Sequence, residues 1–180
     1  MQFIAAKHFT IAHREAVDWV VIHTMELPCR PSIAYRLAGR FSEGARKVSA
    51  HYCVDPNTVI QCVHETDVAW HCPGANRRGI GIEHAGYAYG GAEHDPTDWE
   101  SAEGEAVLRL SAVLVADICK RWGIPVVHLT VDDLKAHHRG IIGHDDATKA
   151  FTVTGGHRDP GPRWPWERFI DLVNAKEKSP

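Results

Sequence analysis

Two histidines and two carboxylates in this sequence are of the types that bind a metal ion and move a proton. His23 and His144 each follow a short apolar run, and Asp159 lies in a loop stiffened by Pro and Gly residues. Two imidazoles and a carboxylate can serve as the three protein ligands of a catalytic zinc ion, which keeps a fourth position open for water. Glu83 ends another apolar run and could accept a proton there. No HExxH-type signature joins these residues, so spacing alone leaves open a surface or hydrogen-bonded polar role for each.

The elements that must position these residues follow from the hydrophobic pattern. Apolar runs predict strands over 19–22, 79–83 and 140–144, the last opening into a long loop to Pro162. A hairpin is predicted from strands over 48–54 and 58–63, joined by a turn at 55–57. Helices are predicted from an N-cap at Ser32 to Gly44, over about 101–122, and from Pro165 through Val173, and the Tyr87–Asp98 segment is predicted to be a Gly-rich loop.

Strands that alternate with helices predict one α/β domain over residues 1–175, with a central mixed β-sheet flanked by helices. Polar residues at the ends of strands gather at one edge of such a sheet. We therefore expect His23, Glu83 and His144 to converge in a groove at the strand ends. The polar residues 176–180 are interpreted as the start of a linker or a disordered tail.

Composition excludes several classes of protein. The net charge of −3 and the pI near 6.5 argue against a nucleic-acid partner, because proteins that bind nucleic acids usually present a basic face. No run approaches the roughly 20 apolar residues of a membrane span, so no membrane insertion is expected. The N-terminus has no charged leader, which predicts synthesis in the cytoplasm without a signal peptide. The five cysteines form no CxxC pair and are interpreted as reduced packing residues.

Several short passages fall in the order found in a known family. They span nearly the whole chain: Val20-Val21-Ile22-His23-Thr24, Val48-Ser49-Ala50-His51-Tyr52, Ala69-Trp70-His71, Gly79-Ile80-Gly81-Ile82-Glu83, Gly143-His144 and Asp159-Pro160-Gly161-Pro162. With them the chain resembles the zinc amidases that include phage lysozyme-type amidases, bacterial anhydro-muramyl amidases and peptidoglycan recognition proteins. Each passage alone is weakly specific, whereas the ordered set is strongly specific.

The resemblance implies a role for each matching residue. Zinc would be held by His23, His144 and Asp159. Glu83 falls where bacterial members carry their catalytic glutamate. His157 falls where many members carry a lysine or another polar donor near the scissile carbonyl.

Further positions bear on the mechanism and on substrate binding. Ala50 stands where some phage relatives have a catalytic tyrosine, which favours Glu83 as the proton acceptor. Trp70, His71 and His51 are predicted to bind substrate, although His51 has an alternative interpretation as a structural hydrogen-bonding residue. His84 alternates with Glu83 along its strand and should face away from the site.

The activity implied by the resemblance is hydrolysis of the amide bond between N-acetylmuramic acid and L-alanine in bacterial peptidoglycan. The polar tail favours the catalytic domain of a phage endolysin, which would be made in the host cytoplasm and act at the cell wall. A C-terminal cell-wall-binding domain is then expected in the full-length protein. A recycling amidase of the bacterial cytoplasm shares the chemistry. The alternative from another class is a non-catalytic peptidoglycan-binding module of the same fold. Such members typically lack a zinc ligand, and this sequence keeps all three.

Overall fold

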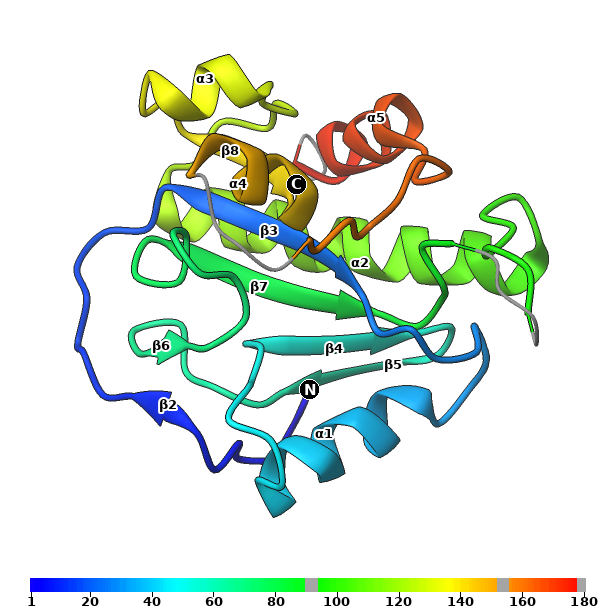
Figure 1. The fold of residues 1–180 in the computed structure, drawn as a ribbon. Coiled ribbons are helices and arrows are strands. Elements are labelled where there is room, and N and C mark those ends of the chain that lie inside the picture. The colour runs from blue at the N-terminus through cyan, green and yellow to red at the C-terminus, as the bar shows by residue number, and fades with distance from the viewer. Residues whose placement is uncertain (90–93, 152–155, 178–180) are drawn as a thin grey trace.

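A six-stranded mixed β-sheet forms the centre of the molecule (Figure 1). The structure is a computed structural model that describes residues 1–89, 94–151 and 156–177. The strand order is β1-β5-β4-β7-β3-β8, and a separate two-stranded sheet pairs β2 with β6. The strands are β1 (Gln2–Phe3), β2 (Phe9–Thr10), β3 (Trp19–Thr24), β4 (Tyr52–Asp55), β5 (Thr58–Gln61), β6 (Val68–Ala69), β7 (Gly79–His84) and β8 (Gly140–Gly143).

Strands β3 and β7 are buried because they lie in the middle of the sheet. All six residues of β3 are buried, and β3 pairs in parallel with β7 on one side and β8 on the other. β4 also runs parallel to β7, while β5 returns antiparallel to β4 as the second strand of the hairpin. The β-branched residues Val20, Val21 and Ile22 suit this two-sided burial. The predicted central mixed sheet is confirmed.

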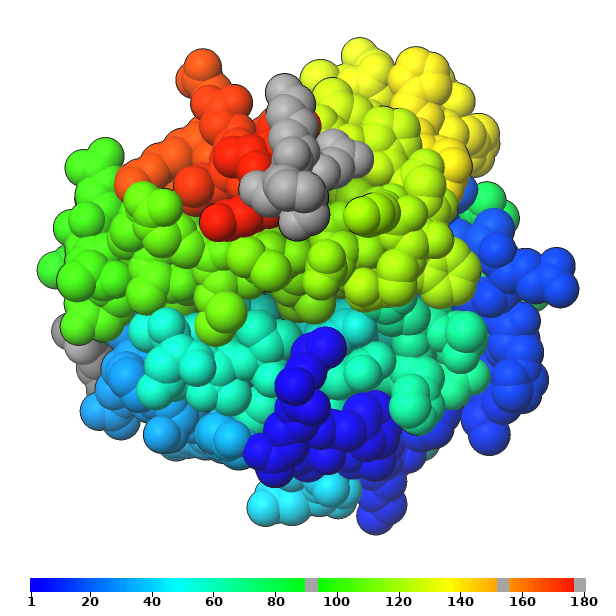
Figure 2. Space-filling model, turned by 180° about the vertical axis from the view of Figure 1, so that it is seen from behind, coloured from blue at the N-terminus to red at the C-terminus, as the bar shows by residue number. Residues whose placement is uncertain are grey.

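The helices cover the sheet unevenly. They are α1 (Ile33–Glu43), α2 (Ala102–Trp122), α3 (Val131–Lys135), α4 (His144–Ala150) and α5 (Trp166–Glu177). α2 and α5 pack together on one face of the sheet, and seen from behind α2 crosses the width of the molecule with α5 above it (Figure 2). Their main core cluster includes Ile22, Ile82, Leu108 and Phe169. Within the described residues no helix is long and apolar enough to cross a membrane.

Smaller apolar clusters than the main one occur among the described residues, and two of them lie on the opposite face of the sheet. The first joins α1 to the hairpin through residues such as Phe41, Cys53 and Ile60. The second lies at the β8 side and includes Val21 and Ile142. Side chains alternate along a strand, so His23 shares the face of Val21. Its pairing partner Glu83 lies on the same face, so His23 and Glu83 form a polar pair between these two clusters.

Most predicted elements are confirmed, and the differences have physical reasons. Ser32 precedes α1 but makes no side-chain capping bond, because Asp55 Oδ2 in the hairpin accepts the hydrogen bond from Ala34 N at 3.0 Å. Gly44 ends α1 in the left-handed conformation, as predicted. Ser101 caps α2 by accepting from Gly104 N, next to the predicted start of this helix at about residue 101. The strand predicted from residue 48 begins only at Tyr52.

The segment after β8 was predicted wrongly as a loop. His144 begins helix α4, whose entry is stabilised by a hydrogen bond from Gly143 N to Asp146 Oδ2 at 2.8 Å. Parts of the predicted loops over 87–98 and 144–162, and residues 178–180 of the predicted tail, lie outside the described residues. Residues 176 and 177 belong to α5. The short elements β1, β2, β6 and α3 were not predicted. None of the five cysteines forms a disulfide, and Cys29 alone is partly exposed.

Candidate metal centre

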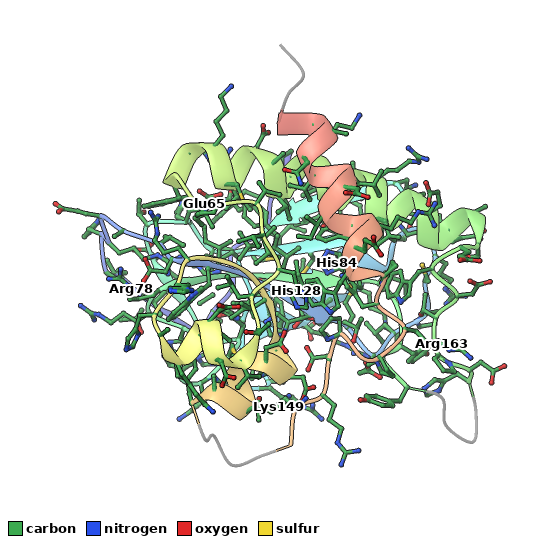
Figure 3. All side chains as sticks on the ribbon, turned by 90° about the horizontal axis from the view of Figure 1, so that it is seen from above. Glu65, Arg78, His84, His128, Lys149 and Arg163 are labelled. Atoms are coloured by element: carbon green, nitrogen blue, oxygen red, sulfur yellow. The ribbon has the colours of Figure 1, made fainter. Side chains whose placement is uncertain are left out.

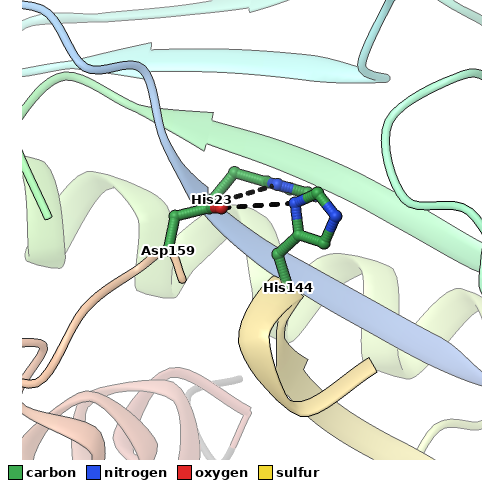
Figure 4. A group of neighbouring side chains, drawn as sticks. All are labelled: His23, His144 and Asp159. Atoms are coloured by element: carbon green, nitrogen blue, oxygen red, sulfur yellow. Dashed lines mark hydrogen bonds and ion pairs between the residues drawn. The ribbon is translucent and has the colours of Figure 1, made fainter. Parts of the chain in front are cut away.

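His23, His144 and Asp159 meet at the carboxyl ends of β3 and β8 (Figure 4). His23 Nδ1 lies 2.8 Å from Asp159 Oδ2, and His144 Nδ1 lies 3.3 Å from Asp159 Oδ1. Both histidines are buried, whereas the aspartate side chain keeps 13% of its surface exposed. The three residues come from β3, the start of α4 and the loop before α5. The structure therefore brings together the three residues that the sequence predicted as ligands.

The donor set fits a tetrahedral metal ion. The three ligand atoms lie within 4.8 Å of one another. Ligands at zinc bond lengths of about 2.0–2.1 Å would be roughly 3.3 Å apart in tetrahedral geometry. The two nitrogen–oxygen distances of 2.8 and 3.3 Å are close to that separation. Two imidazoles and one carboxylate also match the ligand types of catalytic zinc.

Electrostatics keeps the donor atoms of His23 and Asp159 in the forms that bind a metal. Burial lowers the pKa of His23, which favours the neutral imidazole with a free lone pair. Burial opposes the charge on Asp159, but hydrogen bonds from His144 and His23 outweigh it and hold its pKa well below the ordinary value. His23 thus offers a neutral nitrogen, and Asp159 an ionised oxygen, near neutral pH.

Local packing explains how Asp159, far along the chain, reaches the two histidines. Asp145 N in the first turn of α4 donates a hydrogen bond to Asp159 O at 2.9 Å. Pro160 then packs on Gly143, where an added Cβ would lie 2.8 Å from the proline Cδ. The loop that carries Asp159 can approach the end of β8 this closely because Gly143 has no side chain.

Glu83 lies beside His23 in the adjacent strand. Their Cα atoms are paired in the parallel register of β3 and β7, so both side chains leave the same face. Burial, followed by the charge of Asp159, raises the pKa of Glu83 well above its ordinary value. A carboxyl with a raised pKa in a buried polar site has the property expected of a proton carrier. Glu83 is not among the three grouped ligand residues.

His157 lies on the solvent side of the cluster. Its ring stacks on that of His144, with centroids 4.2 Å apart and 13° between the planes. Its Nδ1 lies 3.9 Å from Asp159 Oδ1, and 56% of its side chain is exposed. The residue is therefore next to the metal ligands and accessible to a bound substrate.

The residues predicted to bind substrate differ in exposure. Trp70 is partly exposed, stacks on His8 and donates from Nε1 to Thr10 Oγ1 at 3.0 Å. His71 is also partly exposed as a residue, but its ring points inward, with Nδ1 only 3.0 Å from His23 Nε2. The partly exposed indole of Trp70 therefore remains available to contact a substrate.

His51 is fully buried, so the predicted substrate contact has no exposed atom to carry it. Gly81 N donates to His51 Nδ1 at 3.0 Å, and Nε2 lies 3.2 Å from Asp67 O and 2.9 Å from Arg14 Nη2. Burial and the Arg14 charge lower the pKa of His51 to about 3. The geometry favours a structural role for His51, because both of its ring nitrogens face polar groups of the protein itself.

Arg14 was not predicted, although it braces this region. Its guanidinium donates to the backbone carbonyls of Glu65, Asn76, Arg77 and Gly79. Those carbonyls lie 51 to 65 residues from Arg14 in the sequence, in the loops on either side of β6 and at the first residue of β7. No spacing pattern marks such a residue, because its partners are main-chain atoms.

His84 faces away from the metal centre, as predicted. Its Nδ1 is 2.8 Å from His23 O and its Nε2 is 2.7 Å from Ser111 Oγ on α2. Figure 3 shows it in the interior beneath the start of α5, where it packs against Trp164 and Phe169. Burial lowers its pKa to about 3.

Comparison with known proteins agrees with this geometry. The model of the N-acetylmuramoyl-L-alanine amidase family matches residues 13–162. N-acetylmuramoyl-L-alanine amidase A of Achromobacter lyticus is 28% identical over 174 residues, which cover 89% of this chain and 85% of that protein.

Solved structures share the fold at lower sequence identity. Staphylococcus aureus hydrolase AmiA, solved with its ligand, has a TM-score of 0.74 and 16% identity over 98% of this chain and 82% of that chain. A mutant endolysin from Bacillus subtilis has a TM-score of 0.61 and 15% identity over 96% of this chain and 97% of that one. At these identities the likeness establishes the shared fold.

Proposed function

Because the chain belongs to the N-acetylmuramoyl-L-alanine amidase family and hydrolyses the amide bond between N-acetylmuramic acid and L-alanine in peptidoglycan, we propose that it does so with one zinc ion held by His23, His144 and Asp159. The observation that carries this proposal is the convergence of three ligand atoms within 4.8 Å. A zinc ion bound there would polarise the amide carbonyl and lower the pKa of a bound water toward about 7.

Glu83 is the proposed general base and acid. Its carboxylate would take the proton of the attacking water and deliver it to the nitrogen of the departing L-alanine. Its place beside His23 in the strand register supports this role, because it is adjacent to the centre without being a ligand. The buried environment that raises its pKa favours the protonated form, which is the form that must donate to the leaving amine.

His157 is the proposed donor to the developing oxyanion. Its exposed ring lies against His144 and can turn a nitrogen toward a carbonyl bound at the open side of the centre. Loss of one such donor typically costs about 2.7–4 kcal/mol in transition-state stabilisation. Trp70 is the proposed substrate-binding residue, because its partly exposed indole can cover a sugar or peptide surface.

Metal analysis tests the zinc centre directly. Protein purified without added metal should contain about one zinc per chain, and a His23→Ala variant should contain much less. A chelator should remove the activity, and zinc should restore it. Zinc content well below one together with chelator-resistant hydrolysis would contradict the metal proposal.

Mass spectrometry of digested peptidoglycan tests the role of the centre in the reaction. The wild-type digest should contain free lactyl-muramic ends and peptides that begin with L-alanine, and the His23→Ala digest should lack both. Equal cleavage by the two proteins would refute a catalytic role for this site. The residue 1–175 domain boundary, the endolysin origin, the cell-wall-binding domain and the site of synthesis stay predictions from the sequence.

A further inference from the structure

We propose that His71 is a positioning residue that accepts a hydrogen bond from His23 and fixes its tautomer and orientation for metal binding. This replaces the substrate contact predicted from the sequence, and it rests on the zinc centre proposed above. The side chain comes from the loop between β6 and β7. Its Nδ1 lies 3.0 Å from His23 Nε2, and the two rings meet edge to face at 89° with centroids 5.1 Å apart.

The two nitrogens of His23 have different surroundings. Nδ1 faces Asp159 Oδ2 at 2.8 Å and is the nitrogen on the metal side. Nε2 points to the opposite side, toward His71. A metal-binding nitrogen must offer a lone pair, and a neutral imidazole carries its one proton on the other nitrogen. In the metal-binding form, His23 Nε2–H therefore donates and His71 Nδ1 accepts.

An acceptor behind a ligand histidine has two effects. It selects the tautomer that leaves Nδ1 free, and it increases the electron density that the imidazole gives to the metal. Because His71 Nδ1 is used as the acceptor, its own proton lies on Nε2. That nitrogen is buried and has no hydrogen-bond partner among the described residues. Neither nitrogen of His71 is thus placed to bind an outside substrate.

The His71 ring is held in place from several directions. Asn76 Oδ1 accepts hydrogen bonds from His71 N at 2.9 Å and Cys72 N at 2.6 Å, which fixes the backbone of the loop. The ring lies over Gly81, where an added Cβ would be 2.5 Å from the His71 Nδ1. It also meets the buried His51 ring at a centroid distance of 5.6 Å. These contacts pre-organise the acceptor before metal binds.

Substitutions that keep or remove the acceptor test the proposal. In His71→Asn the amide oxygen can occupy the place of Nδ1, whereas His71→Phe fills the space without an acceptor. Zinc dissociation constants would be measured by competition between the zinc-loaded protein and a chromophoric chelator. We expect His71→Phe to bind zinc about 10–100-fold more weakly than wild type, and His71→Asn to recover most of that loss. If His71→Phe does not fold, His71→Gln replaces it, because the longer side chain carries its oxygen past the Nδ1 position.

Cys72→Ala is the matched control, since it disturbs the same loop and leaves the hydrogen bond to His23 intact. The proposal is overturned if His71→Phe (or its replacement) binds zinc as wild type does, if His71→Asn is equally weak, or if Cys72→Ala is equally weak. At saturating zinc, turnover separates the two roles further. Loss of a positioning residue should lower kcat with little change in KM, whereas a rise mainly in KM would support the predicted contact of His71 with the substrate.

The zinc centre itself is tested separately. If the wild-type protein binds no zinc, or His23→Ala binds it as tightly as wild type, the zinc centre is refuted whatever the His71 variants do. A tight wild-type site that His71→Phe leaves unchanged refutes only the positioning role.

Discussion

Gly81→Ala should weaken both the fold and the metal centre, because the space for a methyl group is filled by a functional side chain. An ideal Cβ on Gly81 would lie 2.5 Å from Cγ and Nδ1 and 2.8 Å from Cδ2 of His71. Relief requires a displacement of roughly 1 Å, since carbon atoms in contact are about 3.5–4.0 Å apart. The backbone of His71 is tied to Asn76, so the ring cannot follow freely. Overpacking of this kind costs about 1–3 kcal/mol of unfolding free energy.

The same displacement would break the hydrogen bond to His23. That bond spans 3.0 Å, and a further 1 Å takes the two nitrogens to about 4 Å, beyond hydrogen-bonding range. Gly81→Ala should therefore also weaken zinc binding, in the direction expected for His71→Phe.

A double-mutant cycle isolates the steric contact. Chemical denaturation with chelator present would compare wild type, Gly81→Ala, His71→Ala and the double variant. Once the ring is gone, Gly81→Ala should become neutral or stabilise the strand by about 0.5–1 kcal/mol, because alanine loses less conformational entropy on folding. We expect a coupling energy of about 1–3 kcal/mol between the two positions.

Gly39→Ala is the matched control in helix α1, where an added Cβ meets nothing within 4 Å. It should stabilise the protein by about 0.5–1 kcal/mol. Equal destabilisation by Gly81→Ala in the presence and absence of the His71 ring would refute the steric argument.

Three further predictions concern the reaction and the response to acid. Glu83→Gln should keep the fold and about one zinc per chain but lose most hydrolysis; loss of zinc together with turnover, measured on the same samples, would make Glu83 a ligand instead. His157→Ala should lower kcat by about 10²–10³ with little change in KM, and His157→Lys should recover part of it; near-normal kcat in the zinc-loaded alanine variant would exclude the oxyanion role. The buried His51 and His84 have pKa values of about 3 against an ordinary 6.5. The unfolded chain therefore takes up their protons first, so stability is complete above about pH 6.5 and is lost as pH falls toward 3, by up to about 1.4 kcal/mol per pH unit for each histidine. Urea unfolding from pH 7 to pH 4 should show this fall, and a flat profile would contradict it.

The fold was predictable where one local pattern dominated. β3 and β7 are continuous apolar runs, and α2 has an apolar face that ends before Gly123, so their types and approximate ends followed from the sequence. The N-cap of α1 was not predictable, because Asp55 replaces Ser32 and comes from a different element. Helix α4 was missed for a related reason. Its first turn is polar and follows a strand directly, and its capping hydrogen bond to Asp146 becomes visible only in three dimensions.

The candidate site was predictable in part. Sequence placed His23, Glu83 and His144 at or near strand ends and offered Asp159 as a carboxylate ligand, and the family resemblance added His157. Sequence could not give the orientation of His71, because its inward position depends on the missing side chain of Gly81. A histidine after an exposed tryptophan looks like a surface residue until that space is known.

The choice of an imidazole rather than a carboxylate behind His23 follows from the charges of the site. A zinc ion would bring two positive charges, ionised Asp159 would bring one negative charge, and Glu83 would bring a second only when it has given up its proton, so the centre would carry no net negative charge. A carboxylate at position 71 would also accept the hydrogen bond, but it would add an uncompensated negative charge in a region of low dielectric. That charge would raise the pKa of Glu83 further, since Asp159 already acts in this direction. It would also weaken the electrophile by giving more electron density to the metal. A neutral His71 fixes the tautomer of His23 without either effect, which explains why the acceptor is an imidazole held rigidly against a glycine.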